Sequence, residues 1–91
     1  MQTVQGSRSE HQVRVFALST CMWCMKTKKL LEENSIEYKF ENVDQLQGQE
    51  REQVLEEVKR HNPKVTFPTV VIDSKPVIGY KEDELKEALG L

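Results

Sequence analysis

The chain has 91 residues, of which 37% are hydrophobic and 31% charged, and this composition is typical of one folded domain. It excludes low-complexity and collagen-like classes. The net charge of −2 gives none of the basic excess expected of a nucleic-acid binder. No apolar run approaches the ~18 residues of a membrane span, and residues 1–12 are too polar for a signal peptide, so we expect a cytoplasmic protein.

The first half of the chain reads as a flexible tail followed by a strand, a helix and a second strand. Residues 1–11 show no apolar periodicity and are expected to be the tail, so that the domain covers residues 12–91. Residues 13–18 are almost all apolar and predict a central strand. Residues 21–34 have helical spacing, and residues 36–41 alternate between apolar and charged side chains as in a strand with one wet face.

The second half predicts a helix, a hairpin and a final helix. Residues 49–61 carry a narrow apolar stripe among charges, which indicates a surface helix. Residues 67–73 and 76–79 predict two hairpin strands, and residues 81–89 a closing helix. The order is therefore β-α-β-α-β-β-α. It predicts an α/β fold of three layers, α/β/α, in which a four-stranded mixed sheet is covered by helices on both faces.

The two cysteines, Cys21 and Cys24, are the feature most informative about chemistry. A structural disulfide would close a very short loop and stabilise little, because loop-closure stabilisation grows with loop length. A structural zinc site would need two more ligands, and the two histidines lack paired spacing, so no metal site is predicted. A redox dithiol is the favoured interpretation of a Cys-x-x-Cys that follows a strand.

The position of the cysteines at a strand-to-helix junction suggests which thiol attacks the substrate and which resolves the mixed disulfide. Unpaired N–H groups at a helix N-terminus favour a negatively charged sulfur, and the thiolate is the attacking species in disulfide exchange. Cys21 stands at this end of the helix, whereas Cys24 lies one turn further in on the same face. We therefore expect Cys21 to attack a substrate disulfide and Cys24 to resolve the mixed disulfide, leaving a Cys21–Cys24 bridge.

Three motifs together resemble the glutaredoxin family, which has a thioredoxin-like fold. They are Cys21-Met-Trp-Cys24, Thr66-Phe67-Pro68 and the turn from Gly79 to Asp83, and the similarity runs from about residue 13 to the end. The resemblance implies that Pro68 is cis beside the cysteines and that Phe67 offers its backbone N–H and C=O to the substrate cysteine. The residues expected to bind substrate are Trp23, Thr66, Phe67, Pro68, Gly79, Tyr80, Lys81 and Asp83.

Two departures from the family pattern bear on the reductant. Leu18 stands where glutathione-using members commonly have a basic residue, and Tyr80 stands where a second glycine is common. The Gly79-Tyr80-Lys81 turn is more similar to NrdH-type redoxins, which feed ribonucleotide reductase. The candidate reductants are accordingly glutathione, thioredoxin reductase and a ferredoxin-dependent reductase, and disulfide-containing proteins, ribonucleotide reductase among them, are the candidate substrates.

Other functions of such a fold stay open at the level of sequence. The resemblance also permits a carrier of a 2Fe–2S cluster or a non-catalytic interaction module. No tightly bound cofactor is expected besides the redox-active disulfide, and a monomer is the expected state. Trp23 is interpreted either as a partner contact or as packing against Phe67 or Tyr80, and Met25 is expected in the core.

Overall fold

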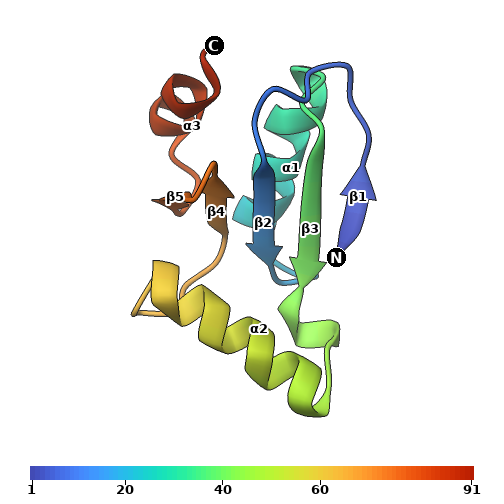
Figure 1. Cartoon of the computed structure of the whole chain (residues 1–91), viewed down its shortest axis with the longest axis vertical. Helices are drawn as coiled ribbons and strands as arrows, with labels where there is room; N and C mark the ends of the chain where they lie inside the picture. The colour runs from blue at the N-terminus through green and yellow to red at the C-terminus, as the bar shows by residue number, and fades with distance from the viewer.

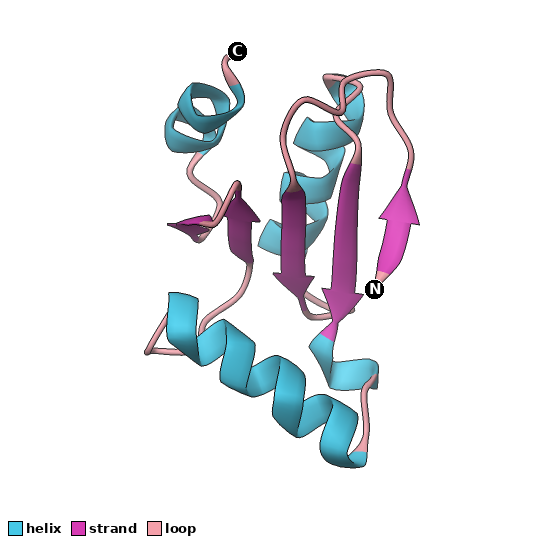
Figure 2. Ribbon diagram, viewed as in Figure 1, coloured by secondary structure: helices cyan, strands magenta, loops and turns pink.

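The computed structural model describes all residues 1–91 as one mixed sheet with helices on both faces (Figures 1 and 2). Five strands in the spatial order β1-β3-β2-β4-β5 form the sheet. The strands are β1 Gln2–Val4, β2 Val13–Ala17, β3 Tyr38–Asn42, β4 Thr69–Ile72 and β5 Lys75–Ile78. The helices are α1 Met22–Glu33, α2 Gly48–His61 and α3 Glu82–Leu89, with a 3-10 turn at Val43–Gln45.

The strand directions confirm the predicted three-layer α/β fold. β2 and β3 run parallel through the crossover helix α1, whereas β4 pairs antiparallel with both β2 and β5. β2 is the central strand, as its nearly continuous apolar run predicted, because it is covered on both faces. No helix of the structure is long and apolar enough to cross a membrane.

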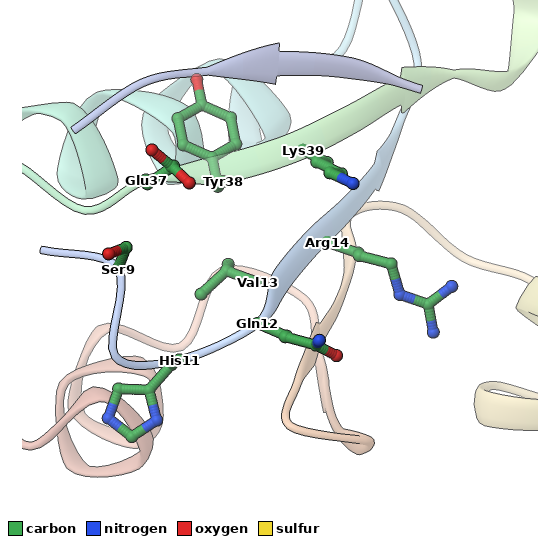
Figure 3. Close-up of a pocket in the computed structure, with 8 residues that line it drawn as sticks. All are labelled: Ser9, His11, Gln12, Val13, Arg14, Glu37, Tyr38 and Lys39. Atoms are coloured by element: carbon green, nitrogen blue, oxygen red, sulfur yellow. The ribbon is translucent and has the colours of Figure 1, made fainter.

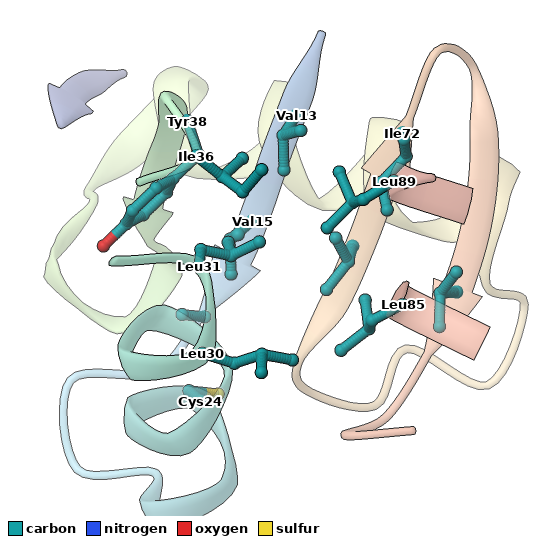
Figure 4. Packing of buried hydrophobic residues seen from close by; sticks show 13 residues of the cluster. Val13, Val15, Cys24, Leu30, Leu31, Ile36, Tyr38, Ile72, Leu85 and Leu89 are labelled. Atoms are coloured by element: carbon teal, nitrogen blue, oxygen red, sulfur yellow. The ribbon is translucent and has the colours of Figure 1, made fainter. Parts of the chain in front are cut away.

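The two faces of the sheet are covered by different helices. A larger cluster joins α1 and α3 to one face, and it contains Leu30 and Leu31 of α1, Leu85 of α3 and Val15 of β2 (Figure 4). A smaller cluster joins α2 to the opposite face, where Val58 packs on side chains from β2 and β4. Because successive residues of a strand point to opposite faces, the alternation along β2 supplies both clusters.

The prediction of a flexible tail over residues 1–11 and of a four-stranded sheet is wrong. Gln2–Val4 pairs antiparallel with β3, and Arg8 bonds on both sides of Ile36, through its N–H to the Ser35 carbonyl at 2.9 Å and its C=O to the Glu37 N–H at 2.8 Å. Only Val4 of this strand touches the core. The segment is held by backbone hydrogen bonds at a sheet edge, which leave no apolar pattern in the sequence.

Candidate active site

The two cysteines lie where β2 leads into α1. Cys21 is the N-cap residue of α1, and its Sγ accepts a hydrogen bond from the Cys24 N–H at 3.2 Å. The sulfur thus takes the place of the hydroxyl or carboxyl oxygen that usually caps a helix. This N–H group and the positive end of the helix dipole both favour the negative form of the Cys21 sulfur.

Burial separates the two thiols. Both cysteines are free thiols, Cys21 is partly exposed, and Cys24 is fully enclosed on the inner side of α1 (Figure 4). Burial, assisted by the interaction with the Cys21 sulfur, raises the pKa of the Cys24 thiol to about 12. Cys21 is therefore the thiol that solvent can reach, and Cys24 is a buried, protonated thiol one helical turn further along α1.

An uncharged groove of about 210 Å³ adjoins the cysteines, and five residues line it: Trp23, Phe67, Pro68, Gly79 and Tyr80. The Phe67–Pro68 peptide bond is cis, as the family resemblance implied. Gly79 has φ of 85°, a conformation that side-chain-bearing residues rarely adopt, and it turns the chain from β5 toward Tyr80. The structure thus brings five of the eight predicted substrate-binding residues to one surface beside Cys21.

Trp23 is both packed and exposed. Its ring stacks on Tyr80 with centroids 5.9 Å apart, and the Lys26 Nζ lies 4.5 Å from the ring centroid. The side chain is still 54% exposed, so it forms a flat apolar wall of the groove. Met25 is exposed as well, contrary to its expected place in the core, because the buried stripe of α1 runs through Cys24, Thr27, Leu30 and Leu31.

Three predicted residues lie outside the groove lining. The Thr66 Oγ1 accepts a hydrogen bond from the buried Asn62 side chain at 2.9 Å. Lys81 is the N-cap residue of α3 and its Nζ lies 3.5 Å from the Glu84 carboxylate. Asp83 is exposed in the first turn of α3. Thr66 therefore helps to hold the loop before β4, and Lys81 contacts the first turn of α3.

Asp44 is a site-proximal residue that the sequence analysis missed. Its carboxylate accepts hydrogen bonds from the backbone N–H of Ser19, at 2.8 Å, and from the Ser19 hydroxyl. These bonds lower the pKa of Asp44 and pin the loop that carries Cys21. The signal was present, because β2 and β3 are parallel and the residues that follow such neighbours meet at the same sheet edge.

A second cavity of about 320 Å³ lies at the opposite ends of β2 and β3 (Figure 3). It is polar and is lined by Ser9, His11, Gln12, Val13, Arg14, Glu37, Tyr38 and Lys39. Val13 and Tyr38 begin their strands, whereas Cys21 follows the far end of β2. The cavity therefore contributes nothing to the chemistry of the cysteines.

Comparison with known proteins agrees with this geometry. The family model described as Glutaredoxin matches residues 13–77. Glutaredoxin 1 of Rickettsia conorii is 32% identical over 69 residues, and the match covers 76% of this chain and 65% of that relative's length.

Solved structures with the same fold are similar over more of the chain. The glutaredoxin of Methanosarcina mazei is 44% identical with a TM-score of 0.91, and the match covers 99% of this chain and 87% of that one. Methanosarcina acetivorans methanoredoxin is 38% identical with a TM-score of 0.89, covering 94% and 90%. The fold of the present chain and its Cys21/Cys24 pair fit a thiol oxidoreductase, and the chain belongs to the glutaredoxin family.

Proposed function

We propose that the protein is a dithiol electron carrier that reduces disulfides. The Cys21 thiolate attacks one sulfur of the substrate disulfide, so that a mixed disulfide forms and one substrate thiolate leaves. Cys24 then loses its proton and attacks the Cys21 sulfur, which forms the Cys21–Cys24 bridge and releases the second substrate thiolate. The substrate gains two electrons and two protons, and the protein loses them.

The observation that carries this proposal is the contact between the two cysteines. The Cys24 N–H lies 3.2 Å from the Cys21 Sγ, and the two thiols occupy one turn of α1. The resolving thiol is therefore already beside the sulfur that it must attack, and this proximity turns the second step into an intramolecular one. The difference in burial supports a first attack by Cys21 and a second by Cys24.

We propose polypeptide disulfides as the preferred substrates. No charged side chain lines the groove beside Cys21, and the exposed faces of Trp23 and Tyr80 suit apolar residues that flank a cysteine. Glutathione carries two carboxylates, and the nearby first turn of α3 is acidic, with Glu82, Asp83 and Glu84. At neutral pH glutathione has two carboxylates and one ammonium group and so a net charge of about −1, and the acidic turn disfavours this anion more than a neutral peptide segment.

Two single-cysteine variants test the assignment of roles. Cys21→Ser should abolish reduction of insulin disulfides by the pre-reduced protein, because the attacking sulfur is gone. Cys24→Ser should form a mixed disulfide that does not resolve, which intact-mass spectrometry would detect as a covalent adduct on Cys21. Full activity of Cys21→Ser would overturn the proposal, and an adduct on Cys24 in the wild-type chain would reverse the roles.

The reductant is tested by offering the oxidised protein to each of three donors. These are glutathione, thioredoxin reductase with NADPH, and a ferredoxin-dependent reductase with its ferredoxin. We propose that a protein donor is preferred, since such a donor uses the same apolar groove as a polypeptide substrate, and we place the reaction in the cytoplasm, where thiols are kept reduced. Faster reduction by glutathione than by either enzyme would contradict this preference.

A further inference from the structure

Asn62 is a buried polar residue that the cysteine chemistry does not explain. It is the C-cap residue of α2, only 2% of it is exposed, and its backbone N–H donates to the Val58 carbonyl at 2.7 Å. A buried amide is costly unless it is hydrogen-bonded. The partners of the Asn62 side chain therefore show what it holds in place.

The partners of the Asn62 side-chain amide are Thr66, in the loop that enters β4, and Thr69, the first residue of β4. Its Nδ2 donates to the Thr66 carbonyl at 3.1 Å, to Thr66 Oγ1 at 2.9 Å and to Thr69 Oγ1 at 3.1 Å. The hydroxyl of Thr69, which is fully buried, also donates to the Thr66 carbonyl, at 2.7 Å. The Thr66 carbonyl thus receives hydrogen bonds from two buried side chains, one on α2 and one on β4.

The orientation of this carbonyl determines the direction of the next N–H. The Thr66 C=O and the Phe67 N–H belong to one planar peptide unit, in which they point in opposite directions when the bond is trans. Holding the carbonyl toward Asn62 and Thr69 therefore turns the Phe67 N–H away from both. Neither the N–H nor the C=O of Phe67 makes a hydrogen bond within the chain. Both are left free beside the groove.

The chain on the other side of Phe67 is held independently. Pro68 has no N–H, and its carbonyl accepts a hydrogen bond from the Gly79 N–H at 2.9 Å. The Phe67 side chain packs between the two core clusters on opposite faces of the sheet. Phe67, whose backbone groups are free, thus lies between Thr66 and Pro68, which are both held by hydrogen bonds. Asn62 holds the Thr66 side.

We propose that Asn62 is a positioning residue that, together with Thr69, aims the free backbone groups of Phe67 at the backbone of a polypeptide disulfide. This inference rests on the proposed function and deepens it. Asn62 does not touch the reacting sulfurs. It acts through the Thr66 peptide, so its effect is confined to substrates that have a peptide backbone beside the reacting cysteine.

Variants at both ends of the network test this role. Asn62→Ala removes the amide, and Asn62→Asp keeps its size while removing the N–H groups that reach the Thr66 carbonyl. Thr69→Val removes the second donor with little change of shape, and Thr69→Ser restores it. Val13→Ala is the control for lost stability, because Val13 is buried at the far end of β2 and touches no part of the network.

The readout compares two disulfides in single-turnover reactions of the pre-reduced protein. Insulin presents a peptide backbone and 2-hydroxyethyl disulfide does not, while the sulfur chemistry at Cys21 is the same. We expect the second-order rate constant for insulin to fall about tenfold or more in both Asn62 variants and in Thr69→Val, since a displacement of about 1 Å can cost up to 10²-fold. The rate constant for 2-hydroxyethyl disulfide should change less than about twofold.

Thr69→Ser and Val13→Ala should keep the wild-type ratio of the two rate constants. An equal loss for both disulfides in the Asn62 and Thr69→Val variants, or no loss for either, would overturn the positioning role. If the wild-type protein reduces neither disulfide, the proposed function itself fails. The two failures are therefore distinguished in one experiment. Thr69→Val keeps the test decisive should the Asn62 variants not fold.

Discussion

The burial of Cys24 makes a quantitative prediction about its reactivity. At pH 8 a thiol with the ordinary pKa of 9.0 is about 10% ionised, whereas a pKa of about 12 leaves about 0.01%. The thiolate population of Cys24 is therefore roughly a thousandfold lower in the folded chain. A more basic thiolate regains about 15- to 30-fold in intrinsic nucleophilicity, so a net slowing of at least thirtyfold remains.

Limiting iodoacetamide and peptide mapping measure this slowing. The fully reduced protein is labelled briefly at pH 8, and the same chain unfolded in denaturant gives the reference rate for each cysteine. We expect Cys21 to take nearly all the label in the folded protein. Labelling of Cys24 within tenfold of its rate in the unfolded chain would refute the link between burial and protonation.

The same raised pKa makes stability depend on pH. Above about pH 9 the unfolded chain releases the Cys24 proton while the folded chain keeps it, so the folded state binds more protons. The free energy of unfolding is therefore unaffected below about pH 9 and falls by about 1.4 kcal/mol per pH unit above it. Burial also raises the pKa of Tyr38, which acts in the same direction at higher pH. Urea unfolding of the reduced protein should show a steeper loss between pH 9 and 10.5 than Cys24→Ala, and equal slopes would contradict the account.

Three further variants probe the N-terminal segment, the Ser19 loop and the groove. A Cβ at Gly6 would stand 2.5 Å from a backbone carbonyl oxygen, so Gly6→Ala should lower the free energy of unfolding by about 1–3 kcal/mol in urea titrations. The hydrogen bonds from Ser19 stabilise the ionised Asp44 carboxylate, so their contribution to the free energy of unfolding is present above about pH 4 and is lost as the pH falls through the lowered pKa of Asp44. Asp44→Asn should remove this contribution, and identical acid-unfolding curves for the variant and the wild-type protein would show that the Ser19 contact does not stabilise the fold. Trp23→Ala removes the Tyr80 stack, so KM for insulin should rise several-fold while stability falls by only about 1 kcal/mol, and an unchanged KM would exclude Trp23 from substrate contact.

The local sequence predicted most of the architecture because each central element carries its own pattern. The apolar run of β2 marks a strand covered on both faces, and the spacing of Cys24, Thr27, Leu30 and Leu31 marks the buried side of α1. The hydrophobicity of Met25 predicts a core residue, but Met25 is exposed because the adjacent residue, Cys24, lies on the buried side of the helix. The short strand β1 was not predicted because backbone hydrogen bonds to β3, rather than side-chain burial, hold it in the sheet.

Two cysteines in a chain of 91 residues are by themselves compatible with a structural disulfide, part of a metal site or a redox pair. Their predicted position between a strand and a helix favours a redox dithiol on an α/β sheet. Secondary-structure periodicity and motif spacing are local properties, and the sequence displays them directly. Only the tertiary structure revealed that Asp44 clamps the loop before Cys21 and that Asn62 holds the peptide before Phe67. Such contacts join elements through a few side-chain hydrogen bonds, which need the right distance and direction in space but impose no repeating pattern on the chain.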